Sequence, residues 1–151
     1  MSRPLTGLNL FLYPGFILNF KTRNQQTDAY LIKTDSLGKL QWQRTYGGTD
    51  WDFGYSLKQT ADEGFLVGGQ TYSYGSGNGD AWLIRTNKNG DTLWTHTYGG
   101  SGYDVANAVL NEGDSLYLIA GATTSFGKGY TSMLFIYTRS GMSKKWSPAA
   151  N

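Results

Sequence analysis

Hydrophobic residues occur along the chain in short runs, separated by clusters of glycine and polar residues. In the middle of the chain this pattern predicts four strands, at residues 54–59, 64–70, 81–86 and 92–98. The segment 87–90, Asn-Lys-Asn-Gly, has the composition of a hairpin turn, and residues 74–79 form a glycine-rich loop. Residues 81–84 are apolar at every position, which is typical of a strand that is covered on both faces.

The same pattern recurs along the chain with a fixed period. Residues 28–48 and 80–100 align without a gap at a spacing of 52, with 11 of 21 positions identical. Trp42, Trp94 and Trp146 are also 52 residues apart. Self-similarity at a constant period of this length is the signature of a repeat architecture.

The N-terminal part joins the series when a deletion of three residues is allowed, which places residues 15–18 over 64–67. We therefore divide residues 1–151, taken as a single repeat domain, into copies at 7–48, 49–100 and 101–146. The third copy diverges, because Ser132 stands where the other two copies have an aspartate.

A four-stranded antiparallel unit of this length, repeated and covered on both faces, is typical of a β-propeller blade. We predict an all-β fold, a β-propeller-like array of about three four-stranded antiparallel blades. Trp42, Trp94 and Trp146 are expected to pack between neighbouring blades as structural residues. Because closed rings usually have about four to eight blades, we expect a partial ring, half of a dimeric ring, or terminal copies that act as caps.

Composition narrows the function classes. With 13 Lys and Arg against 11 Asp and Glu, the net charge of +2 does not favour nucleic acid as a partner. The chain has no Cys and a single His, which excludes disulfides and a multi-His metal centre. No apolar stretch is long enough for a membrane span, and the apolar N-terminal segment is interrupted by Asn9, Pro14 and Gly15, so no signal peptide is evident.

Aromatic residues in predicted loops are the first candidates for ligand binding. The chain has 11 Tyr, 7 Phe and 5 Trp, and Trp51, Tyr74 and Tyr103 fall in loops or at strand ends, as do Tyr72 and Tyr130. Exposed aromatic rings stack on sugars and anchor protein interfaces. Packing over the blade edges is the alternative role for these rings.

Acidic residues are the second set of candidates. Asp52 and Asp104 each follow a Gly-Gly pair, where they could line a ligand or cation site or, as repetition favours, cap a turn. Asp80 follows the glycine-rich loop and is the residue that would serve calcium, but Ser132 replaces it in the third copy. We predict no metal site, no cofactor and no catalytic residue, since the single His96 occupies the position of Arg44.

The motifs resemble a known group of repeats. Residues 97–101 (Thr-Tyr-Gly-Gly-Ser), 69–73 (Gly-Gln-Thr-Tyr-Ser) and 28–33 (Asp-Ala-Tyr-Leu-Ile-Lys) resemble the propeller-type repeats of large secreted bacterial and archaeal surface proteins. The resemblance implies a β-propeller, an extracellular or cell-surface location, and a scaffold or interaction role. Residues 35–42, with Asp, Gly, Lys and Trp in spaced positions, are also similar to blades of quinoprotein-like propellers.

We therefore expect a non-catalytic propeller repeat module that interacts with a protein or a glycan on a cell surface. One alternative is a lectin-like, carbohydrate-binding propeller that uses the loop aromatics. A second is a fragment of a quinoprotein-like or lyase-type propeller enzyme. If the ring is closed by a second chain, we expect a homodimer.

Overall fold

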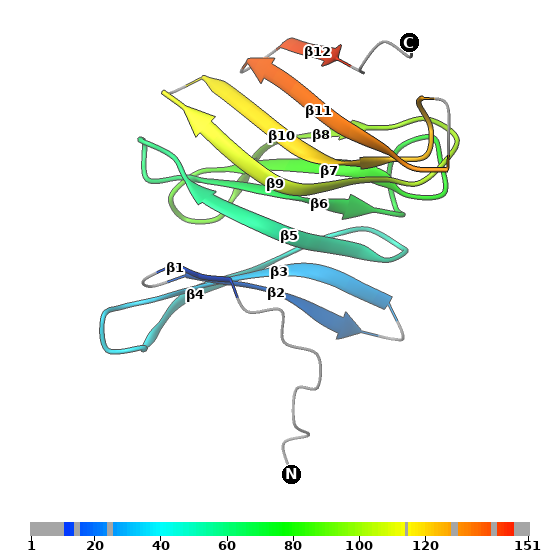
Figure 1. The fold of residues 1–151 in the computed structure, drawn as a ribbon. Coiled ribbons are helices and arrows are strands. Elements are labelled where there is room, and N and C mark those ends of the chain that lie inside the picture. The colour runs from blue at the N-terminus through cyan, green and yellow to red at the C-terminus, as the bar shows by residue number, and fades with distance from the viewer. Residues whose placement is uncertain are drawn as a thin grey trace.

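A computed structural model of the chain describes residues 11–13, 16–23, 26–113, 115–127, 130–139 and 142–146. These residues form three four-stranded antiparallel sheets and contain no helix (Figure 1). The expected all-β fold, with four-stranded antiparallel units, is confirmed. Since no helix occurs in the described ranges, none of them contains a helix that could cross a membrane.

Each sheet takes its strands from one repeat, in sequence order across the sheet. Sheet 1 comprises β1 (Phe11–Tyr13), β2 (Phe16–Arg23), β3 (Gln26–Thr34) and β4 (Leu40–Tyr46). Sheet 2 comprises β5 (Asp52–Gln59), β6 (Phe65–Thr71), β7 (Asp80–Thr86) and β8 (Thr92–Tyr98). Sheet 3 comprises β9 (Asp104–Glu112), β10 (Leu116–Thr123), β11 (Ser132–Arg139) and β12 (Met142–Trp146).

The observed strands of sheet 2 differ from the expected ones mainly at one end. The last strand matches residues 92–98, whereas β5 and β7 begin earlier than expected, at Asp52 and Asp80. Both aspartates pair with Thr71 at the end of β6, one from each side. The ladder therefore extends into the acidic positions, which a hydrophobic pattern assigns to the preceding loops.

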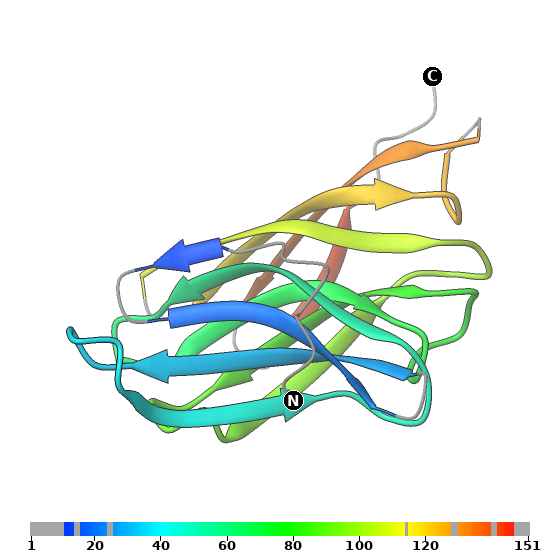
Figure 2. The same ribbon diagram turned by 90° about the horizontal axis from the view of Figure 1, so that it is seen from below.

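The three sheets are stacked face to face, with sheet 2 in the middle (Figures 1 and 2). The first strand of sheet 2, β5, contacts β2 and β3 of sheet 1, with a smaller contact to β1, and it contacts β9 of sheet 3 on the other side. A run of apolar residues at 81–84 makes sense in this arrangement, since β7 is buried along its whole length between sheets 1 and 3. This burial of both faces explains why the strand lacks the alternation of a half-exposed one.

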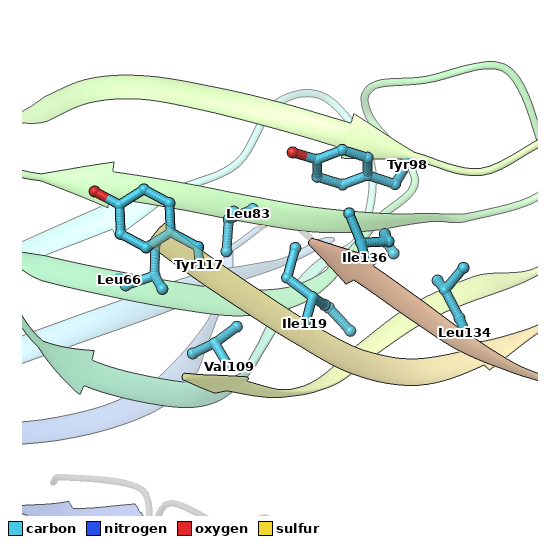
Figure 3. Packing of buried hydrophobic residues seen from close by; sticks show 10 residues of the cluster. Leu66, Leu83, Tyr98, Val109, Tyr117, Ile119, Leu134 and Ile136 are labelled. Atoms are coloured by element: carbon cyan, nitrogen blue, oxygen red, sulfur yellow. The ribbon is translucent and has the colours of Figure 1, made fainter. Parts of the chain in front are cut away.

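Two apolar clusters hold the stack together, one at each interface between sheets. The cluster between sheets 1 and 2 contains Ala29, Leu31, Trp42, Tyr46, Leu57, Phe65, Val67, Trp82 and Ile84. All nine have their equivalents, 52 residues later, in the cluster between sheets 2 and 3, which also includes Leu66 and Ala106 (Figure 3). The two interfaces are thus built from the same positions of the repeat.

Two of the three indoles that are 52 residues apart lie at these interfaces. Trp42 of β4 meets Phe65 of β6 edge-on, with ring centroids 5.6 Å apart. Trp94 of β8 lies 5.6 Å from the ring of Tyr117 on β10, and 117 is the repeat equivalent of 65. Each indole reaches from the fourth strand of one sheet to the second strand of the next.

Trp146 differs in register. Trp42 and Trp94 pair with Lys33 and Arg85, whereas Trp146 pairs with Phe135, two residues from the equivalent Tyr137. The strands β11 and β12 are joined by residues 140–141 alone, a shorter connection than the one between β3 and β4. The side chain of Trp146 lies outside the described residues.

The N-terminal alignment is off by one residue. Ile17 pairs with Ile32, just as Val67 pairs with Ile84, so residue 17 corresponds to 67 and not to 66. The deletion is therefore two residues instead of three. The difference has consequences, because a slip of one residue along a strand exchanges its two faces.

Candidate interaction surface

The aspartates at the start of β5 and β9 are buried turn caps. Asp52 Oδ2 accepts hydrogen bonds from the backbone N–H of Gly48, at 2.8 Å, and from the hydroxyl of Ser73, at 2.6 Å. Its Oδ1 accepts the hydroxyl of Thr71. Asp52 is completely buried, so its carboxylate joins the Gly-Gly turn to the end of β6 and is not presented at the surface.

Asp104 repeats this arrangement in sheet 3, with one difference. Its Oδ2 accepts the N–H of Gly100, at 3.0 Å, and the hydroxyl of Ser125, the equivalents of Gly48 and Ser73. Its Oδ1 is buried and has no hydrogen-bond partner in the described part of the chain. Both candidate aspartates thus occupy the capping role that repetition favours.

Asp80 caps the glycine-rich loop that precedes it. Its Oδ2 accepts the backbone N–H groups of Ser76, at 3.0 Å, and Gly77, at 3.1 Å. In the third repeat, Ser132 lies in the same place beside Gly127 as Asp80 beside Gly75. A hydroxyl therefore replaces the carboxylate at this loop, and no group of three or more His, Cys, Asp or Glu that could hold a metal occurs in the described ranges.

Neighbouring sheets bring two of these carboxylates together at Gly99. A Cβ atom on Gly99 would lie 2.2 Å from Asp80 Oδ1 and 2.6 Å from Asp104 Oδ2. Gly47 lies in the same way between Asp28 and Asp52. Glycine is required at these positions because any side chain would collide with two carboxylates, one from each sheet.

Aromatic side chains gather where β5 begins and β6 ends, and we call this group the aromatic patch: Trp51, Phe53, Tyr55, Tyr72 and Tyr103. The ring of Tyr72 meets Trp51 edge-on, with centroids 6.2 Å apart, and Phe53 at 6.4 Å. Phe53 in turn stacks on Tyr55 at 6.0 Å, with 9° between the ring planes. The patch is therefore a continuous set of ring contacts along β5 and across to β6.

Tyr103 belongs to the patch through its position beside Gly79 and Tyr72. It forms an isolated bridge with Gly79, and the Tyr72 ring lies 3.1 Å from the place that a Cβ of Gly79 would take. Burial raises the pKa of the Tyr72 hydroxyl, and the neighbouring Tyr103 and Asp50 raise it further. Burial likewise raises the pKa of Tyr55, with Tyr72 adding to the effect.

The patch combines rigid support with accessible rings. Trp51 is 50% exposed and Tyr103 is 53% exposed. Tyr72 N–H donates to the Trp51 carbonyl at 2.8 Å, and Tyr103 N–H donates to Thr124 Oγ1 at 2.6 Å. Hydrogen bonds therefore fix the main chain of Trp51 and Tyr103 at the ends of strands, while about half of each residue is exposed.

Tyr74 has a different environment from the patch. Its hydroxyl donates to the carbonyl of Gly47 at 3.0 Å, and its ring tilts over Trp82 at 5.9 Å. It thus connects the glycine-rich loop of sheet 2 to the Gly-Gly turn of sheet 1. Tyr130 lies in the corresponding part of sheet 3 and is almost completely exposed.

Some residues of this region escape prediction from sequence. Phe53 and Tyr55 are part of the patch, and the alternation Trp51-x-Phe53-x-Tyr55 places them on one side of a strand, a signal that could have found them. The buried Arg85 forms an ion pair with Asp62 at 2.6 Å, and its Nε donates to the Tyr117 hydroxyl at 3.3 Å. That contact has no sequence signal, because the equivalents of Arg85 are Lys33 and Tyr137.

Comparison with known proteins gives one similarity and no family. No protein-family model matches the chain. The chain is 29% identical over 113 residues to the regulatory protein FlaEY of Caulobacter vibrioides. This alignment covers 66% of the chain but only 12% of the length of FlaEY. The aligned length exceeds two periods of the repeat.

Proposed function

We propose that the chain is a non-catalytic β-propeller repeat module that binds a protein or another cell-surface partner through the aromatic patch. The observation that carries this proposal is the patch itself. Trp51 and Tyr103, at equivalent positions of consecutive repeats, each expose about half of their surface on a rigid strand end. Large aromatic side chains that are already ordered lose little conformational entropy on binding, which suits an interface anchor.

Three features support a propeller as the scaffold. The strands of each sheet are adjacent in sequence order. The first strands of sheets 2 and 3, β5 and β9, lie in contact, as first strands do where blades surround an axis. Both interfaces between sheets use the same nine positions of the repeat.

The roles of the polar residues support a binding function over a catalytic one. Asp52, Asp80 and Asp104 direct their carboxylates at backbone N–H or hydroxyl donors of their own turns. His96 packs between Trp94, at 4.8 Å, and Tyr98, at 6.3 Å, in the row where sheet 2 faces sheet 3. Each of these side chains has a structural role.

The proposal is tested by binding of the labelled chain to intact cells and isolated envelope of the organism that encodes it. We expect saturable binding that falls at least about tenfold in Trp51→Ala and in Tyr103→Ala. Leu93→Ala is the matched control, because Leu93 is an exposed apolar residue on β8, outside the patch. Absence of binding, or equal binding by wild type and Trp51→Ala, would contradict the proposal.

Carbohydrate is the second candidate ligand, and the geometry of Trp51 favours it. The indole stands edge-on to Tyr72, so that its face is not covered by that ring. Stacking on the face of an indole is how a protein contacts the apolar side of a sugar ring. A glycan array probed with wild type and Trp51→Ala separates the two ligand classes: binding to cells without binding to any glycan identifies a protein partner.

A further inference from the structure

The outer face of sheet 3 is apolar and open. Leu110, Leu118, Met133 and Tyr137 are all exposed there. They are neighbours across the strands, because Leu118 pairs with Leu110 on β9 and with Tyr137 on β11. We call this surface the sheet-3 open face.

The same face is fully covered in sheet 2. Leu66 and Ala81 are completely buried against sheet 3, whereas their equivalents Leu118 and Met133 are 38% and 60% exposed. Leu83 is also completely buried, and its equivalent Phe135 lies on the sheet-3 open face. Two of the three repeats thus use these positions to hold another sheet, and in the third repeat they are apolar and exposed among the described residues.

Sheet 1 carries two positions of the facing half of this interface on its own outer face. Trp82 and Ile84 of β7 are buried against sheet 1, and Leu134 and Ile136 of β11 are buried against sheet 2. Their equivalents on β3 are Tyr30 and Ile32, which are only half-buried. We call this surface the sheet-1 open face, defined by Tyr30 and Ile32.

The hairpin of sheet 1 gives independent support for a missing neighbour. A Cβ on Gly90, in the hairpin of sheet 2, would lie 2.8 Å from Trp42 and from Arg44 on the fourth strand of sheet 1. The equivalent Gly38 has nearly the same positive φ, +79° against +77°, and would meet nothing within 4 Å. The hairpin of sheet 1 therefore has the same backbone shape as the hairpin that packs on β4, but no fourth strand of another sheet packs against it among the described residues.

We propose that the two open faces are complementary halves of one interface, by which two copies of this chain join head to tail into a ring of six sheets. The inference rests on the propeller architecture of the proposed function. A head-to-tail interface closes only when the rotation between its subunits returns to the start. With three sheets in each chain, two copies give six, which is the one multiple of three within the usual range of about four to eight blades.

The first measurement is the mass in solution, by light scattering after size exclusion. We expect a dimer of twice 16.7 kDa that persists on dilution. A monomer at every concentration overturns the proposal and leaves further sheets of a longer chain as the occupants of these faces. A series of growing oligomers overturns the closed ring, because an interface that does not close forms open chains.

Substitutions on the two faces test the head-to-tail arrangement. Phe135→Lys alters the sheet-3 open face and Ile32→Asp alters the sheet-1 open face. We expect each to weaken dimerisation at least about 100-fold, because an unpaired charge would be buried in both interfaces of the ring. Leu93→Lys is the control, since Leu93 is exposed on β8 of the middle sheet and lies on neither open face.

Mixing the Phe135→Lys and Ile32→Asp variants gives a result that misfolding cannot produce. A mixed ring has one wild-type interface and one in which the two introduced charges, of opposite sign, lie together, so we expect the dimer to return. If Phe135→Lys abolishes the dimer while Ile32→Asp does not, the sheet-3 open faces of the two copies pair with each other, and the proposal is overturned. Binding by the aromatic patch is measured separately, so a monomer that still binds cells would refute the ring alone.

Discussion

The two interfaces between sheets share their apolar residues and differ in their polar ones. Between sheets 1 and 2, Arg44 pairs with Asp91 at 3.1 Å, and the Tyr46 hydroxyl donates to the Gly90 carbonyl at 2.7 Å. Between sheets 2 and 3, the position of Arg44 is taken by His96, and the position of Asp91 by Ser143. The polar links there include the contact of Arg85 with the Tyr117 hydroxyl and the hydrogen bond that Val109 N–H donates to Ser56 Oγ at 3.1 Å.

This difference shows which part of the repeat determines stacking. The nine apolar positions are kept from one interface to the other, so they are sufficient to set how one sheet lies on the next. The Arg44–Asp91 and Arg85–Tyr117 contacts each occur at one interface, so they contribute stability there without defining the arrangement, whereas the aspartate caps at the Gly-Gly turns recur at both. Dispersion and apolar burial are largely non-directional, which is why the same cluster tolerates Phe65 in one copy and Tyr117 in the other.

The largest expected effect is the loss of an indole. Trp42→Ala and Trp94→Ala each remove a large ring that packs against the second strand of the next sheet. We expect each to lower the free energy of unfolding by about 3 kcal/mol, measured by urea denaturation. Similar values would support equivalence of the two interfaces, and a cost below about 1 kcal/mol for one of them would break it.

Glycine substitutions compare a packed hairpin with an open one. Gly38→Ala introduces only the strain of a side chain at φ +79°, which costs about 1 kcal/mol. Gly90→Ala adds a collision with Trp42 and Arg44, and we expect a cost of about 2 to 3 kcal/mol. Thermal unfolding of the two variants checks this order, and equal costs would show that the hairpin of sheet 2 is free to move away from β4.

Two ion pairs differ in the burial of their arginine, because Arg85 is 6% exposed and Arg44 is 40% exposed, whereas both aspartates are more than half exposed. Asp62→Ala leaves the guanidinium of the buried Arg85 without its carboxylate, and we expect a loss of about 2 kcal/mol. Asp91→Ala removes a pair with the partly exposed Arg44, and we expect a much smaller loss, because solvent screens this pair. Urea denaturation in low and high salt measures both, and only the second loss is expected to vanish at high salt.

The Asp62 contact is also expected to depend on acid pH. The Thr60 hydroxyl and Arg85 lower the pKa of the Asp62 carboxyl to about 2, despite an opposing effect of burial. Because the folded pKa is below the ordinary value of 3.8, the contact contributes stability above about pH 4, and this contribution is lost as the pH falls toward 2. The stability of wild type and of Asp62→Ala should therefore converge as the pH falls through this window.

Some features of the molecule follow from sequence because they recur. The period of 52 residues locates four strands per repeat, and the repetition of Asp52 and Asp104 favours a turn cap, which is the geometry that both residues have. A residue type that recurs at equivalent positions indicates a structural role that the copies share, such as capping a turn or packing at an interface between sheets.

Other features could not be predicted, since they depend on a single copy. The ion pair of Asp62 with Arg85 joins a turn to a strand in the second repeat, and no other repeat has a basic residue and an aspartate in both positions. Trp146 pairs with Phe135, whereas Trp94 pairs with Arg85, the equivalent of Tyr137, and an ungapped alignment cannot show this change of register. This change of register is visible only in the backbone pairing.

The pairs of glycines that follow β4 and β8 mark the ends of the first two repeats, and the equivalence of the repeats has a consequence for how such a chain can gain or lose a unit. The segment from 49 to 100 is one period. Leu31 of sheet 1 now packs in the same cluster as Ile84 of sheet 2. If residues 49–100 were removed, sheet 1 would instead pack on sheet 3, with Ile136 in the place of Ile84. The new junction would be chemically the same as the old one. Duplication or loss of a whole unit therefore creates no surface that the remaining units do not already recognise, and unequal recombination can shorten or extend the stack without a new solution to its packing.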